Sequence, residues 1–232
     1  MTRAILLDIE GTTTPIAFVH EVLFSYARDH VKEFLANNAD EADITRLREE
    51  QATDISNGEQ PPSEIDAYVE WLIARDRKST VLKSLQGKIW RGGYLDGSLN
   101  SQVYADVAPA FARWRASGLS INIFSSGSVL AQQLLFAHTN SGDLTKYIDQ
   151  YFDTNVGKKG EAESYRKIAE ALGLRADEVL FISDVVAELD AASTAGMETF
   201  LSIRPGNELQ AHADKYRAIY NFEQIGSRKG AK

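Results

Sequence analysis

Cysteine is absent from all 232 residues, which excludes disulfides, thiolate nucleophiles and cysteine metal sites. A metal ion would then need mostly oxygen or histidine ligands. Long apolar runs are missing too, because no stretch approaches the roughly 20 residues that a membrane-spanning helix needs. The N-terminus also lacks the apolar region of a signal peptide. These absences predict a cytoplasmic protein with no membrane partner.

Positive charge is in short supply, with 25 Lys and Arg against 33 Asp and Glu and a formal charge of −8 at pH 7. This balance argues against a nucleic-acid partner. It does not exclude a small anionic substrate, because local fields and a bound metal can override the average charge. The length allows a core domain that carries a smaller inserted one.

Short apolar runs alternate with helical patterns along most of the chain. We expect strands at 4–7, 119–124, 151–153, 179–183 and 199–203, and helices at 108–116, 129–137, 161–172 and 188–194. Strands separated by helices predict right-handed βαβ units, and therefore an α/β fold with a parallel sheet covered on both faces. Residues 227–232 are expected to be frayed.

A helix-rich region interrupts this alternation between the first two strands. Apolar spacing predicts helices at 18–35, 41–55 and from Ser63 to Leu85, and the glycines of 89–93 are expected to break the pattern. We therefore predict an α/β core of residues 1–17 and 101–232 and an inserted helical cap of residues 18–100.

The first expected strand ends in two carboxylates, Asp8 and Glu10. In an extended chain residues i and i+2 point to the same side, so these two acids would face the same way. Like charges this close repel unless a cation or a shared proton relieves them.

Other strands also end in polar groups. Residues 125–128 read Ser-Ser-Gly-Ser and open a helix whose N-terminus can bind an anion. Lys159 follows the third strand, and Asp184 ends the fourth, with Glu188 and Asp190 close behind. Ligands of an open parallel sheet bind beyond the carboxyl ends of its strands, so these groups should surround one crevice. Its carboxylates suit Mg²⁺, which takes one or two carboxylates plus substrate phosphate.

These segments resemble a known family. The residues Asp8-Ile-Glu-Gly-Thr12, Phe124-Ser-Ser-Gly127, Lys159 and Ile182-Ser-Asp184 are similar, in this order, to the four motifs of the haloacid dehalogenase-like hydrolases. With Glu10 in the second acidic place, the first motif resembles that of the enolase-phosphatases of methionine salvage. The similarity covers essentially the whole chain.

The resemblance implies a Rossmann-like core with a helical cap and a two-step reaction. The substrate, 2,3-diketo-5-methylthiopentyl-1-phosphate, would be enolised and its phosphate ester then hydrolysed to acireductone. Asp8 would be the nucleophile, and one Mg²⁺ per chain would be held by Asp8, Glu10 and Asp184. Ser125, Ser126 and Lys159 would bind the phosphate and the rest of the substrate, and the enzyme would work as a monomer.

Several roles stay open at this stage. Glu10 is a candidate for general acid and base, which competes with its place as a metal ligand. Glu10, His20 and Glu21 are alternative bases for the enolisation. An apolar pocket for the methylthio tail could come from the aromatic residues Phe18, Phe24 and Trp90.

Three other functions compete with this interpretation. A magnesium phosphatase of the same fold could act on another sugar phosphate. A dehalogenase is disfavoured because it would leave Glu10 and the phosphate-binding pattern idle. A receiver-like signalling module, with Asp8 as phosphoacceptor, would have no use for an inserted cap.

Overall fold

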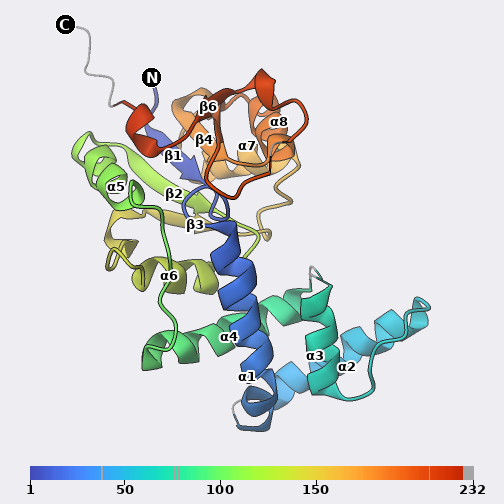
Figure 1. Ribbon diagram of the computed structural model, residues 1–232. Coiled ribbons are helices and arrows are strands. Elements are labelled where there is room, and N and C mark those ends of the chain that lie inside the picture. The colour runs from blue at the N-terminus through green and yellow to red at the C-terminus, as the bar shows by residue number, and fades with distance from the viewer. Residues whose placement is uncertain (38, 76, 78, 209, 227–232) are drawn as a thin grey trace, which may run out of the picture. The chain divides into compact units, whose positions relative to one another are not determined.

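The computed structural model describes residues 1–37, 39–75, 77, 79–208 and 210–226 (Figure 1). The tail that was expected to be frayed, residues 227–232, lies outside the described residues. Among the helices of the described ranges, none is both long and apolar enough to cross a membrane.

Parallel strands in the order β3-β2-β1-β4-β5-β6 form the sheet at the centre of the fold. β1 lies between β2 and β4, so that Leu7 pairs with both Ile123 and Ile182. The strands are β1 (Ala4–Leu7), β2 (Ser120–Phe124), β3 (Gln150–Phe152), β4 (Val179–Ser183), β5 (Glu198–Ser202) and β6 (Arg217–Ile219). The α/β prediction is confirmed, and the carboxyl ends of β1, β2 and β4 meet at one edge.

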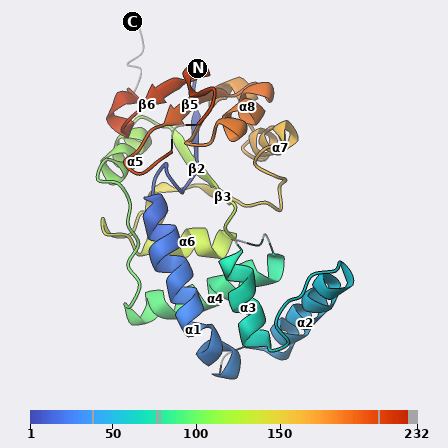
Figure 2. The same cartoon turned by 45° about the vertical axis from the view of Figure 1, so that its right-hand side comes forward.

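Helices cover both faces of this sheet, which explains why its strands read as continuous apolar runs. They are α5 (Val107–Ala116), α6 (Val129–Ala137), α7 (Ala162–Ala171) and α8 (Val186–Thr194). Leu6 and Phe181 pack with residues of α7 and α8 in one buried cluster, while α5 lies against β2 and α6 against β3 (Figure 2). Short 3₁₀ turns lie at Thr145–Tyr147, Ala176–Glu178, Ala213–Lys215 and Phe222–Gln224.

The sequence did not predict β6. This strand has only three residues, Arg217, Ala218 and Ile219. A run this short carries no measurable period-2 signal, so only its pairing with β5 defines it as a strand.

The chain divides into two compact units, one of Met1–Val19 with Asn100–Lys232 and the other of His20–Leu99. The first, the core unit, contains the sheet. The second, the helical unit, contains α1 (Phe24–Asn37), α2 (Glu41–Ser56), α3 (Ile65–Ala74) and α4 (Thr80–Asp96). A π-helix of six residues, η1 (Phe18–Leu23), precedes α1, and α1 packs on α3 and α4.

The expected helix from Ser63 to Leu85 is wrong, because two helices share this stretch. α3 ends at Ala74 and α4 begins at Thr80. Ser79 is the N-cap of α4, and its hydroxyl accepts a hydrogen bond of 3.0 Å from the Leu82 N–H. A side chain that satisfies one of the first free N–H groups favours a new helix start at this point.

The break expected at residues 89–93 is also wrong, because α4 continues through them to Asp96. Gly93 faces the inside of the helical unit. A Cβ atom there would lie 2.6 Å from Cζ of Tyr26 and 2.9 Å from Cδ1 of Leu99. Gly93 therefore allows close helix packing, and the helix ends instead at Gly97, whose φ of 81° is left-handed.

Gly93→Ala should destabilise the protein by about 1–3 kcal/mol, since the added methyl group overpacks the contact with Tyr26. Gly92→Ala is the matched control, because it lies in the same helix and a Cβ there would meet nothing within 4 Å. This control should gain about 0.5–1 kcal/mol from the better helix propensity of alanine. Urea unfolding of both variants measures the difference, and shifts of equal sign would contradict the packing explanation.

Candidate active site

A buried lysine joins two acidic residues at the carboxyl end of the sheet. Asp8 follows β1, and its N–H donates to the Ile182 carbonyl of β4 over 3.0 Å. The Lys159 ammonium, from the loop after β3, donates to Oδ1 of Asp8 and to Oε2 of Glu188, the latter over 2.7 Å. The Asp8 and Lys159 side chains are only 7% and 8% exposed, so this is an interior ion pair.

Glu188, which the sequence placed close behind Asp184 at the expected crevice, belongs to this site, although its pairing with Lys159 was not predicted. It lies in the first turn of α8, and the Ser183 hydroxyl donates to its Oε2 over 2.8 Å. The same hydroxyl accepts a 3.1 Å hydrogen bond from the Val185 N–H. Its position four residues after Asp184, across a strand-to-helix junction, is the sequence signal that placed it at this crevice.

The charges of the site do not balance. Burial, followed by the Asp8 and Glu188 carboxylates, raises the pKa of Asp184 to about 7. Burial also raises the pKa of Glu188 to about 7, against the lowering effect of Lys159. Burial works to lower the pKa of the Lys159 ammonium, but Asp8 and Glu188 outweigh it and hold that pKa above its usual value. The carboxylates of Asp8, Asp184 and Glu188 thus lie near a single ammonium, that of Lys159. This excess of negative charge favours a further cation.

The turn after Asp8 closes onto Asp184. Ile9 accepts hydrogen bonds from three successive backbone N–H groups, of Thr12, Thr13 and Thr14, over 2.9–3.2 Å. Gly11 adopts a left-handed φ of 68°, and a Cβ atom on it would lie 2.3 Å from Oδ2 of Asp184. Only glycine combines this conformation with this approach.

The loop after β2 supplies hydroxyl and backbone donors at the neighbouring strand end. The Ser125 N–H donates to the Phe152 carbonyl over 3.1 Å, and its hydroxyl accepts from the Gly127 N–H over 3.2 Å. A hydroxyl that accepts can still donate its own proton. The Gln132 side-chain amide donates to the carbonyls of Gly127 and Phe152, over 2.9 and 2.8 Å, and so links this loop to the end of β3.

The donor set fits Mg²⁺ better than a metal that needs a complete protein cage. In the part of the chain that the structure describes, no three His, Asp or Glu side chains form a ready-made ligand group. Mg²⁺ keeps several waters and binds through one or two carboxylates plus substrate phosphate. Asp8 and Asp184, at the ends of adjacent strands with excess negative charge between them, meet that requirement.

Comparison with known proteins identifies the family of this chain. A family model described as haloacid dehalogenase-like hydrolase matches residues 2–196. Enolase-phosphatase E1 of Synechococcus elongatus is 52% identical over 231 residues, covering 95% of this chain and 96% of that one. The chain belongs to the enolase-phosphatase E1 family of the haloacid dehalogenase-like hydrolases.

Relatives of this family extend beyond bacteria. Enolase-phosphatase E1 of Danio rerio is 42% identical and covers 97% of this chain and 94% of its own. The crystal structure of the UTR4 protein of Saccharomyces cerevisiae, 38% identical, superposes with a TM-score of 0.78 over 96% of this chain and 99% of that one. The fold is therefore shared along the whole chain.

The structure brings together some of the residues that the sequence predicted to form the site. Asp8, Lys159 and Asp184 meet at the carboxyl ends of the strands, and Ser125 and Ser126 follow the neighbouring strand β2. Glu10 forms an isolated β-bridge with Thr14 in the turn after Asp8.

Most of the remaining predicted residues belong to the other unit. His20, Glu21, Phe24 and Trp90 belong to the helical unit, whereas Phe18 belongs to the core unit. Phe24 stacks on Trp90 with ring centroids 6.4 Å apart, and the Trp90 indole N–H donates to the Leu23 carbonyl over 2.8 Å.

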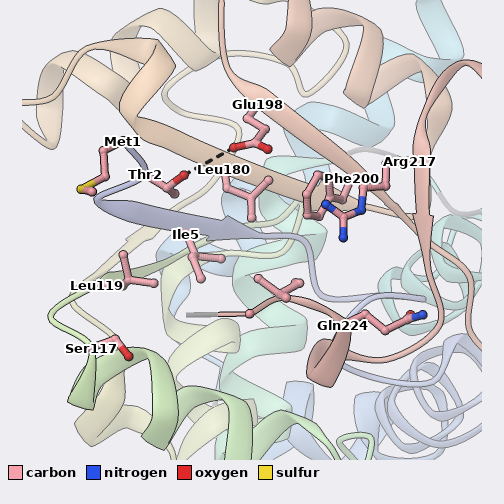
Figure 3. Close-up of a pocket in the computed structure, with 12 residues that line it drawn as sticks. Met1, Thr2, Ile5, Ser117, Leu119, Leu180, Glu198, Phe200, Arg217 and Gln224 are labelled. Atoms are coloured by element: carbon pink, nitrogen blue, oxygen red, sulfur yellow. Dashed lines mark hydrogen bonds between the residues drawn. The ribbon is translucent and has the colours of Figure 1, made fainter. Parts of the chain in front are cut away.

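A cavity of about 400 Å³ opens at the other end of the strands (Figure 3). Ile5, Leu180 and Phe200 line it with apolar side chains, and Glu198 and Arg217 line it with charged ones. These residues lie near the amino ends of β1, β4, β5 and β6. The cavity is therefore separate from the site of Asp8, Lys159 and Asp184 at the carboxyl ends of the strands.

Replacing Lys159 by methionine should cost about 3–5 kcal/mol of the free energy of unfolding in EDTA, because buried carboxylates lose their counter-charge. Lys158→Met is the matched control, since the Lys158 side chain is 84% exposed and pairs only loosely, over 3.5 Å, with Glu161. Its unfolding curve should nearly overlay that of the wild type. Equal losses in the two variants would show that the ion pair does not carry the site.

Proposed function

We propose that this protein is an acireductone synthase of methionine salvage. It would enolise 2,3-diketo-5-methylthiopentyl-1-phosphate and then hydrolyse the phosphate ester of the enol. The membership of the family supports this activity. The observation that carries it is the contact of Asp8 with buried Lys159 beside Asp184, which gathers a nucleophile and a cation at the carboxyl end of the sheet.

Asp8 is the proposed nucleophile. Lys159 binds one of its oxygens, Oδ1, and thereby fixes the carboxylate so that the other oxygen can attack phosphorus in line. The ester P–O bond breaks as the Asp8–phosphorus bond forms, and the leaving alkoxide takes a proton. Water then attacks the phosphorus of the aspartyl phosphate, which frees inorganic phosphate and restores the Asp8 carboxylate.

The remaining residues would stabilise charge. The Lys159 ammonium, the Ser125 hydroxyl, Ser126 and the first N–H groups of α6 can bind the non-bridging phosphate oxygens. One Mg²⁺ per chain, held by Asp8, Glu10 and Asp184, would supply Lewis-acid neutralisation of the phosphate and of the developing enolate. Glu188 also pairs with the Lys159 ammonium, and the Ser183 hydroxyl donates to the same Glu188 oxygen.

Glu10 is the proposed proton carrier. Two residues after Asp8, it can protonate the leaving alkoxide and later accept a proton from the attacking water. The same carboxyl is the first candidate for the enolisation base, ahead of His20 and Glu21. If Glu10 binds metal through its backbone carbonyl, its side chain stays available for these steps.

We further propose that residues 18–100 act as a cap on a core of residues 1–17 and 101–232. A cap of this kind would exclude bulk water from the phosphoenzyme. The stacked Phe24–Trp90 pair offers an apolar surface of the kind that the methylthio tail requires. The proposed enzyme is a cytoplasmic monomer whose partner is the small phosphate ester.

With the diketo-methylthiopentyl phosphate and Mg²⁺, enol absorbance should rise before phosphate is released, and both signals should vanish in EDTA. Asp8→Asn should lower phosphate release by at least about 10³-fold, because the nucleophile is lost. Phosphate from generic sugar phosphates, with neither signal from this substrate, would replace the proposal by a magnesium phosphatase of other specificity.

Glu10→Gln should abolish enol formation as well as phosphate release, since the amide cannot accept the proton. Stopped-flow absorbance of the enol measures the first step, and a phosphate assay measures the second. Lys158→Met again serves as a control that should keep both. An enol signal that persists in Glu10→Gln would move the role of the base to His20 or Glu21.

A further inference from the structure

The loop that follows β5 contacts two segments of the core unit: the turn after Asp8 and the start of α8 after Asp184. This loop, residues 203–208 and 210 together with Ser202 at the end of β5, is called the β5 loop below. The Arg204 guanidinium donates through Nε to the Thr12 carbonyl over 3.1 Å. Gln210 accepts a 2.8 Å hydrogen bond from the Val186 N–H at the start of α8. One loop thus holds the turn after Asp8 and the helix after Asp184.

Two further contacts converge on the carbonyl of Gly11. Asn207 donates to it through Nδ2 over 2.9 Å, and the Ser202 hydroxyl donates over 3.2 Å. Gly11 is also the residue whose α-carbon lies against the Asp184 carboxylate, as its missing Cβ would meet Oδ2 at 2.3 Å and Asn207 Nδ2 at 3.1 Å. Asn207 therefore lies where the turn and Asp184 meet.

The amide of Asn207 has a fixed orientation. Its Nδ2 faces two carbonyl oxygens, of Gly11 and of Ser202, and among the described residues its buried Oδ1 has no hydrogen-bond donor. The cavity beside it, lined by Asp184, Asn207 and Gln210, is only about 10 Å³ and admits at most one water. No substrate group reaches Asn207 by that route, so it acts on the backbone.

We propose that Asn207 is a positioning residue for the carboxylate site: by holding the Gly11 carbonyl, it fixes the turn that carries Asp8 and Glu10 against Asp184. This inference rests on the proposed function, because its purpose is the shared binding of Mg²⁺ by these acids. Groups that orient metal ligands from behind commonly change affinity or activity by about 10–100-fold when removed.

The test measures Mg²⁺ binding directly, without substrate. MgCl₂ is titrated while the Tm is followed, which gives the Kd from the linkage between binding and stability. Asn207→Ala and Asn207→Leu should each weaken the Mg²⁺ Kd by about 10-fold or more. Leucine keeps the branched shape of the asparagine side chain and lacks the donor, so a loss in both variants identifies the hydrogen bond rather than an empty space left by truncation. The Mg²⁺ needed for half-maximal activity should rise with little change in kcat at saturating Mg²⁺.

Two further variants sharpen the result. Ser202→Ala removes the other donor to Gly11, and the double variant with Asn207→Ala should lose more than the product of the single effects, since the buried carbonyl is then left without either donor. Asn140→Ala is the matched control, because its side chain bridges the N–H and carbonyl of Val103 in the same unit. It should lower the Tm and leave the Mg²⁺ Kd unchanged.

The outcomes separate the two levels of the proposal. A wild-type Tm that ignores MgCl₂, together with no phosphate release, would overturn the proposed function and this role with it. Wild-type binding that both Asn207 variants keep within about 2-fold would overturn the positioning role alone, well short of the effect expected for such groups. Loss in Asn207→Ala with normal binding in Asn207→Leu would also overturn it, as packing would then be sufficient.

Discussion

The buried ion pair between Lys159 and Asp8 is the contact on which the candidate active site of this protein depends. It joins the loop after β3 to the end of β1, and Glu188 extends it to α8. Burial makes each of these charges costly alone, so the three elements must meet for any of them to be tolerated. The negative charge that remains favours the presence of a further cation.

Parallel register brings these groups together. β1 pairs with β2 on one side and β4 on the other, so residues 8, 125 and 184 follow the ends of three adjacent strands. The local turns then set the detail: Gly11 lets one acidic segment approach the other, and the β5 loop holds that approach from behind. A site built this way is held by backbone carbonyls as much as by its charged side chains.

Much of the fold follows from local pattern, and the errors have identifiable causes. The alternation of apolar strands and helices predicted the parallel core, because strands buried on both faces read as apolar runs. Gly93 was misread because a glycine that permits close helix packing looks in the sequence like one that ends a helix. β6 was missed because three residues carry no period, and its existence depends on a partner strand.

The amino-acid sequence by itself determined the chemical inventory: which strand ends carry Asp8, Glu10, Ser125, Lys159 and Asp184, and hence the reaction class that they resemble. Short-range patterns record these features because they arise from neighbours in the chain. Only the tertiary structure decided that Glu188 shares Lys159 and that Asn207 holds Gly11. These contacts join residues 29 and 196 positions apart, and no local period can encode a hydrogen bond across such a separation.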